Sequence, residues 1–192
     1  SSSSLIFYWG INDSFENLEL HNIFFSKDYE KEFNSIFNEM EFCDDPTIYL
    51  SITSKDNPSD APAGCENWYV MINTHYDSDH DWVDLANRYK KIIIKKIERV
   101  LGKSIEKNIV SEEILSPKTI FERTQSYRGA LYGPSSNETF SAFHRHPNFT
   151  NKLNNLYFCG GSVHPGGGIP MCLLSAKIVD GLISKKYNSK DL

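Results

Sequence analysis

Short apolar and aromatic runs bounded by turn residues predict strands in the first half of the chain. Residues 5–11 form one such run, and residues 21–25 form a second candidate. The segments "TIYLSITS" and "NWYVMINT" are the clearest pair, because the link between them holds two prolines and a glycine but no helical pattern. We therefore expect these two strands to be antiparallel.

Apolar residues recur at helical spacing in two other segments. Residues 27–39 carry one apolar stripe. Ser26 is the expected N-cap of this helix, and acidic residues follow in the first turn, where the helix dipole favours them. A longer helix is expected to begin at Asp81 and to end at Gly102, a residue type common just after a helix.

The pattern is less regular after the long helix. Residues 109–124 are expected to be extended segments broken at Pro117, and residues 125–151 carry the scattered Gly, Pro, Ser and Asn of a loop. A loop of this length in a compact domain is usually functional or packed against another part of the protein.

A glycine-rich turn stands between a strand pattern and an apolar segment in "NNLYFCGGSVHPGGGIPMCLLSAKIVDGLI". Residues 156–159 are expected to be a strand. Residues 171–183 are apolar or small on most faces, which is typical of a buried helix. Pro170 is expected at the first helical position. An N–H group at that position has no acceptor within the helix, so proline loses no helical hydrogen bond there.

This arrangement suits a ligand that contacts the main chain. The first amides of a helix lack partners within the helix, the dipole adds positive potential, and glycine allows close approach. Such a site would bind an anion or a carbonyl that gains negative charge. The alternative is a tight turn that needs glycine only for its positive φ. The spacing matches neither a P-loop nor GxGxxG in its usual register.

Composition narrows the classes of function. The formal net charge of −5 lacks the basic excess of nucleic-acid binders, so we expect no nucleic-acid partner. The four cysteines show no zinc-binding spacing, and the histidines of "HRHP" and "HYDSDHD" have no matching ligands, so no metal is expected.

The cysteines and the lengths of the apolar runs favour a cytoplasmic location. Free thiols suit a reducing compartment, and no apolar run reaches the ~18 residues of a membrane span. The lysines between residues 90 and 96 are either a docking face for anionic lipid or a solvated helix face, so membrane association stays open. The sequence opens on a strand pattern without a signal peptide, and we expect the chain to be cut from something longer.

Family resemblance adds what spacing does not. The segment that contains "HPGGGIP" closely resembles the C-terminal flavin-contacting signature of the bacterial and fungal type phytoene desaturases, which are FAD-dependent carotenoid desaturases. The segments "SSSSLIFYWGI", "DDPTIYLSITSKDNPSDAPAGCENWYVM" and "GALYGPSSNETFSAFHRHPNF" resemble other parts of that family in the same order. The resemblance therefore covers nearly the whole chain, and "HPGGGIP" is its most specific part.

The resemblance implies an α+β fold class. A mixed or antiparallel sheet with packed helices would come from a substrate domain, and the last strand and helix from an FAD-binding domain. Residues 1–122 would be part of the substrate-binding domain, and residues 123–192 the C-terminal return segment of the FAD-binding domain. The sequence lacks the GxGxxG unit that holds the ADP half of FAD in the family. We therefore expect a C-terminal fragment that alone neither holds FAD tightly nor turns over substrate.

The implied function of the parent protein is FAD-dependent desaturation of a carotenoid precursor, such as phytoene, or of a similar long polyene. The alternatives are a related saturase, oxidase or isomerase on another lipophilic substrate, and a non-catalytic lipid-binding module. The implied partners are therefore a lipophilic polyene and, optionally, a membrane surface, while the oligomeric state stays open.

The implied FAD contacts lie in the glycine-rich turn. They are Gly160, Gly161, Ser162, His164, Gly166, Gly167, Gly168, Ile169, Pro170 and Met171. No catalytic residue is assigned, because His164 could contact the flavin, handle a proton or simply be held by the turn. Two departures matter. Met171 stands where many family members have glycine, and Ser162 stands where amine oxidases often have an acidic residue, which favours the desaturase branch.

Overall fold

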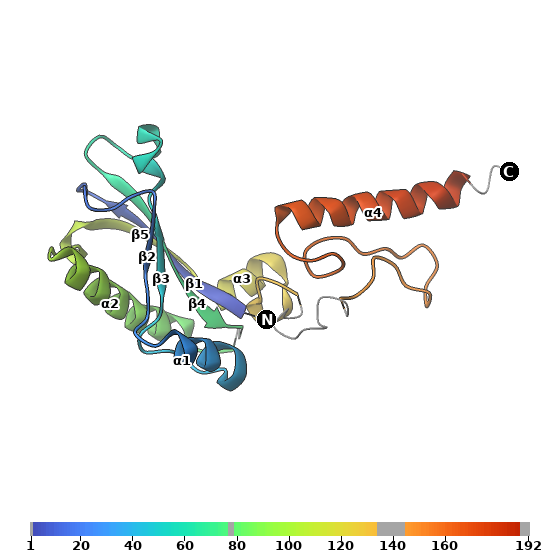
Figure 1. Cartoon of the computed structure of the whole chain (residues 1–192), viewed down its shortest axis with the longest axis horizontal. Helices are drawn as coiled ribbons and strands as arrows, with labels where there is room; N and C mark the ends of the chain where they lie inside the picture. The colour runs from blue at the N-terminus through green and yellow to red at the C-terminus, as the bar shows by residue number, and fades with distance from the viewer. Residues whose placement is uncertain (1, 77–78, 134–144, 189–192) are drawn as a thin grey trace. The chain divides into compact units, whose positions relative to one another are not determined.

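The computed structural model describes residues 2–76, 79–133 and 145–188. The chain divides into two compact units, Ser2–Leu131 and Tyr132–Leu192. Figure 1 shows a sheet with helices in the first unit and one long helix with its preceding loops in the second. The predicted α+β class is confirmed.

The first unit contains a five-stranded antiparallel sheet. Its strands are β1 (Ser2–Ile11), β2 (His21–Phe24), β3 (Ile48–Ser51), β4 (Glu66–His75) and β5 (Ile109–Leu115). Their order in space is β2-β3-β4-β1-β5. The predicted antiparallel pairing of β3 with β4 is confirmed, with Leu50 opposite Val70. The long strands β1 and β4 lie at the centre and pair along their whole lengths.

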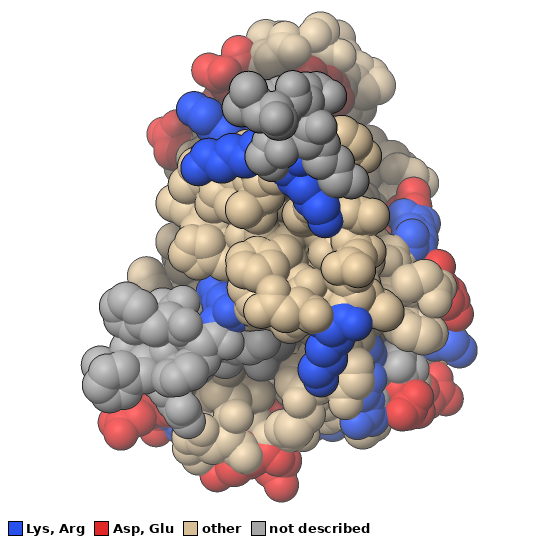
Figure 2. All heavy atoms as spheres, turned by 90° about the vertical axis from the view of Figure 1, so that its right-hand side faces the viewer, with Lys and Arg blue, Asp and Glu red and all other residues tan. Residues whose placement is uncertain are grey.

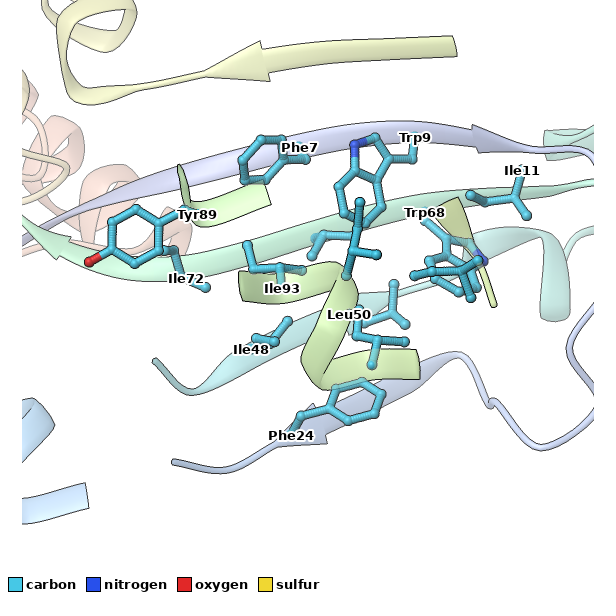
Figure 3. Close-up of a cluster of buried hydrophobic side chains, with 14 of the residues drawn as sticks. Phe7, Trp9, Ile11, Phe24, Ile48, Leu50, Trp68, Ile72, Tyr89 and Ile93 are labelled. Atoms are coloured by element: carbon cyan, nitrogen blue, oxygen red, sulfur yellow. The ribbon is translucent and has the colours of Figure 1, made fainter. Parts of the chain in front are cut away.

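One face of this sheet carries the apolar core. Along most of β4 every second residue is buried, as period-2 alternation requires, whereas in β1 residues 3–7 are all buried. The helix α2 (Trp82–Leu101) runs along the core side of the sheet (Figure 1). Figure 3 shows the side chains from both layers meeting there. The fully buried members include Leu5, Phe7, Trp9, Leu50, Trp68, Ile72, Tyr89, Ile93 and Ile97.

The long helix begins and ends where the sequence predicts. The Asp81 carboxylate accepts hydrogen bonds from the amides of Val83 and Asp84, and Gly102 adopts the left-handed conformation with φ 64°. For the shorter helix the predicted cap is wrong. The carboxylate of Asp28, and not Ser26, accepts from the third amide of the helix, while the Ser26 amide donates to Thr47.

The shorter helix also has a different form from the one expected. α1 (Tyr29–Asn34) continues as a π-helical turn, Ser35–Glu39, so helical structure spans nearly the predicted residues. Single 3-10 turns occur at Thr53–Lys55, Pro58–Asp60, Glu106–Asn108 and Tyr127–Gly129.

The prediction of extended structure up to residue 124 is wrong in its second half. After β5 the chain forms α3 (Pro117–Thr124). Ser116 and Thr119 form a capping box. Pro117 occupies the first turn, where an N–H group has no acceptor within the helix, so proline loses no helical hydrogen bond. Proline therefore starts a helix here and does not merely interrupt a strand.

The second unit contains α4 (Ile169–Asn188) and the segments before it. The strand predicted at residues 156–159 is not formed. A ladder needs a partner strand, and among the described residues this segment makes one isolated bridge, Tyr157 to Phe149. The helix starts one residue before Pro170, so this proline takes the second position and not the first.

The prediction that this helix is buried is also wrong. Leu173 is 68% exposed and Ile169 is 78% exposed. Figure 2 shows a broad area without charged side chains on one face, with Lys and Arg around it. The described part of the unit supplies too little apolar surface to cover a helix that is apolar on most faces. No helix among the described residues is long and apolar enough to cross a membrane.

Candidate functional site

The glycine-rich turn adopts the backbone conformations that glycine permits. Gly160, Gly166 and Gly168 have φ values of 121°, 142° and 96°. Other residues rarely adopt these conformations, so the requirement for positive φ is real at these three positions. The need for positive φ explains three glycines of the turn, but it does not show whether the turn contacts a ligand.

The start of α4 has unused hydrogen-bond donors. The Cys172 amide closes the first helical bond, to the Gly168 carbonyl at 2.9 Å. Within the described parts of the chain, the amides of Gly168, Ile169 and Met171 have no acceptor. The side chains of Ile169 and Met171 are themselves exposed. The main chain can therefore donate to a ligand here, and the helix dipole favours one with negative charge.

The glycines differ in what surrounds them. A Cβ atom added to Gly160 or Gly168 would meet nothing within 4 Å. One added to Gly167 would lie 2.8 Å from the Tyr132 ring, and one at Gly166 would lie 3.1 Å from the Arg145 guanidinium. The middle of the turn is thus packed by side chains of its own unit, while Gly160 and Gly168 face open space.

The predicted contact residues at the entry to the turn already bond within the unit. The Gly160 amide donates to Ser175 Oγ at 3.1 Å, and the Gly161 carbonyl accepts from Arg145 at 3.3 Å. The amide of Gly160 is therefore occupied. The amides at the start of α4, from Gly168 to Met171, are not occupied in this way by any described residue.

His164 is held through its main chain. Its amide donates to the His146 carbonyl at 3.0 Å, and its carbonyl accepts from Asn148 Nδ2 at 2.9 Å. The His164 side chain is exposed, as is that of Ser162. Of the three roles considered for His164, the geometry favours a residue that the turn holds in place. It gives no support for a catalytic role of the imidazole ring.

The described residues contain no group of three or more His, Cys, Asp and Glu side chains that could hold a metal ion. In the "HRHP" segment, His146 lies against the Phe158 ring at 4.8 Å between ring centres. His144 lies outside the described residues.

Two buried residues that hold the turn in place, Asn148 and Ser175, were not predicted from the sequence. Asn148 is 4% exposed and Ser175 is fully buried. A small hydroxyl inside the apolar run of residues 171–183 was a usable signal, because an apolar helix places a polar group inside only when it has a partner. Asn148 stands in a loop without periodicity and gave no such signal.

The sheet face opposite α2 carries a row of aromatic side chains. Tyr8 packs edge-on against Tyr69 at 5.5 Å between ring centres, and Tyr69 packs against Tyr49 at 6.1 Å. The row ends at His21, which stacks on Tyr49 and shares a 2.9 Å hydrogen bond with its hydroxyl. These rings lie on β1, β4, β3 and β2, so the row crosses four strands.

Comparison with known proteins identifies the relatives of the chain. It is 57% identical over 183 residues to a 1-hydroxycarotenoid 3,4-desaturase of Flavobacterium sp. (strain P99-3), a match that covers 95% of this chain and 38% of that protein. It is also 35% identical over 185 residues to a 4,4'-diapolycopene oxygenase of Methylomonas sp, covering 93% and 36% of the two chains. A 4,4'-diaponeurosporene oxygenase of Staphylococcus aureus (strain MSSA476) is 34% identical over 188 residues, covering 97% and 38%.

These matches agree with the resemblance found in the sequence. The resemblance to the carotenoid desaturase family is confirmed. The chain spans well under half the length of the curated relatives it matches, about 38%. No family model matches the sequence. The domain boundary near residue 122 and the set of FAD contacts stay predictions.

Proposed function

We propose that the chain is part of an FAD-dependent oxidoreductase that modifies a carotenoid. Its sheet would belong to the substrate domain, and its glycine-rich turn with α4 would belong to the FAD-binding domain. The single observation that carries the proposal is the set of unused amides at Gly168, Ile169 and Met171, in a segment matched to carotenoid-modifying enzymes.

The turn fits the negatively charged part of a flavin. Open space at Gly168 allows close approach, and three amides without described acceptors lie within four residues. FAD would supply acceptance of the hydride that leaves the substrate, and its reduced ring carries negative charge at the pyrimidine edge. The amides of this chain would donate to that charge, and the dipole of α4 would add to the attraction.

The reaction favoured is desaturation. The identity to the 3,4-desaturase is 57%, whereas the identities to the two oxygenases are 35% and 34%. The same match favours a carotenoid with a hydroxylated end over phytoene as the substrate. The aromatic row from Tyr8 to His21 suits a long, flat polyene, since aromatic faces stack on extended π-systems. A saturase or isomerase would need the same surfaces and stays the alternative.

Flavin content tests the proposal. The longer protein that contains this chain should be purified as wild type, as Gly168→Ala and as Gly181→Ala. We expect the wild type to show a stoichiometric flavin absorption band and Gly168→Ala to lose most of it, because alanine at φ 96° is strained and reshapes the turn. Gly181 lies within α4 and has no close neighbour, so Gly181→Ala is the matched control and should keep the flavin.

Two results would contradict the proposal. One is a longer protein that binds a carotenoid without flavin, which would favour the lipid-binding module. The other is full flavin content in Gly168→Ala. The absorption of the extracted carotenoids identifies the reaction. Cells that supply a 1-hydroxylated carotenoid should yield a product that absorbs at longer wavelength, and cells that supply only phytoene should not.

A further inference from the structure

One buried side chain joins the entry and the middle of the glycine-rich turn to α4. Asn148 Nδ2 lies 3.0 Å from the Phe158 carbonyl, 2.9 Å from the His164 carbonyl and 2.9 Å from Ser175 Oγ. The Phe158 amide donates back to the Asn148 carbonyl at 2.8 Å. The amide group of Asn148 has two N–H donors for three acceptors, so at least one N–H is shared. This loop residue thus fixes the entry to the turn and its middle at once.

Ser175 completes the attachment from the helix side. Its hydroxyl oxygen accepts from Asn148 Nδ2 and from the Gly160 amide at 3.1 Å. Ser175 lies in the second turn of α4 and is fully buried, while most of this helix is exposed. We call Asn148 and Ser175 together the polar clamp.

The polar clamp determines which amides stay available. It uses the Gly160 amide inside the unit, and it ties the turn to the same helix whose first amides have no described acceptor. Gly160 and Gly168, which both face open space, are at opposite ends of the held segment. A shift of α4 relative to the turn would therefore move the amides at Gly168, Ile169 and Met171 relative to any ligand that the turn contacts.

We propose that the polar clamp positions the glycine-rich turn so that the amides at the start of α4 meet the flavin. Asn148 and Ser175 are positioning residues that act through the backbone they hold. The inference rests on the proposed function, and two measurements separate its failure from the failure of that function.

The first measurement needs only the 192-residue chain. Amide hydrogen exchange should be compared among wild type, Ser175→Ala and Ser184→Ala. Alanine is the best helix former, so α4 should persist in both variants. We expect the Gly160 amide of Ser175→Ala to exchange about tenfold faster, since it loses its acceptor. Ser184 is exposed on the same helix and is the matched control. Unchanged exchange at Gly160 would overturn the clamp.

The second measurement uses the longer protein with bound FAD. We expect Ser175→Ala to bind FAD about tenfold more weakly and to lower the flavin reduction potential, because displaced amides stabilise the reduced, negatively charged ring less. Asn148→Asp keeps the shape but removes both donors, so its effect should be larger. Asn151→Asp, at an exposed position, should change neither quantity.

The potential distinguishes positioning from simple stability. A residue that only stabilises the unit would lower the melting temperature and leave the potential of the flavin that remains bound unchanged. An unchanged FAD affinity and potential in folded Ser175→Ala would overturn the inference. If the wild-type longer protein holds no flavin, the proposed function and the positioning role both fail, while exchange at Gly160 still decides whether the clamp holds the turn.

Discussion

Different interactions stabilise the interior of each of the two units. Every buried apolar side chain among the described residues lies in Ser2–Leu131. In the unit that begins at Tyr132, the buried side chains that the structure describes are the polar Asn148 and Ser175. The apolar residues of that unit, such as Leu173, stay exposed or half-buried.

This difference shows which unit has a complete core. A sheet with a long amphipathic helix on one face buries its own apolar side chains and gains most of its stability from them. An apolar helix with hydrogen-bonded loops gains little in this way. The described part of the second unit thus leaves the apolar side chains of α4 exposed or half-buried.

The largest expected effect is a contrast between two leucines. Leu50 is fully buried, and Leu50→Ala should lower the free energy of unfolding by about 2–5 kcal/mol, from lost burial and the cavity left behind. Leu173→Ala should change it by less than about 0.5 kcal/mol. Denaturant unfolding of the chain, followed by tryptophan fluorescence and far-UV circular dichroism, measures both. Equal losses would contradict the difference between the units.

A buried carboxylate should make the first unit sensitive to acid. Burial raises the pKa of Glu66, but hydrogen bonds from Lys55, the Phe15 amide and the Trp68 indole outweigh it and lower the pKa overall. Its stabilising effect is therefore present above its unfolded pKa of about 4.3 and is lost as the pH falls through the lower folded value.

Glu66→Gln tests this dependence. It should cost about 1–3 kcal/mol at neutral pH, because Lys55 loses its 2.7 Å partner, and much less once Glu66 is protonated in the wild type. Glu16→Gln, at an exposed position, is the control. A loss independent of pH would show that the charge of Glu66 does not contribute.

The polar clamp should affect only its own unit. Asn148→Ala leaves two carbonyls and Ser175 without its donor, at a cost of about 1–2 kcal/mol to the second unit. Amide exchange near Phe158 should accelerate while the tryptophan transition stays in place, since all three tryptophans lie in the first unit. A shifted tryptophan transition would contradict the prediction that the polar clamp stabilises only the second unit.

The smallest expected effect concerns the cap of α1. Asp28→Ala should cost about 0.5–1 kcal/mol, because its carboxylate accepts from the Lys31 amide at 3.0 Å. Ser26→Ala should be nearly neutral, since no described residue bonds to the Ser26 hydroxyl. Thermal unfolding of both variants measures the difference. A larger loss for Ser26→Ala would restore the cap expected from the sequence.

The sequence predicts the first unit well because its core is local in pattern. Apolar and aromatic runs bounded by turn residues located β1 and β4, and Asp81 with Gly102 marked both ends of α2. Pro117 was misinterpreted because proline can end a strand or begin a helix, and the Ser116–Thr119 capping box decides for the helix.

The second unit is less predictable because its structure depends on contacts between distant segments. Residues 156–159 have a strand pattern but pair with no strand that the structure describes. The helix after them is apolar, yet exposed, because burial requires a second surface. Asn148 holds residues 10 to 27 positions away, and no local periodicity reveals that role.

Amide hydrogen exchange of the longer protein, with FAD and after its removal, tests the central claim most directly. The account predicts that FAD slows exchange at Gly168, Ile169 and Met171, while the Gly160 amide, already bonded to Ser175, changes little. Bound FAD that leaves those three amides exchanging as fast as in the free protein would contradict it.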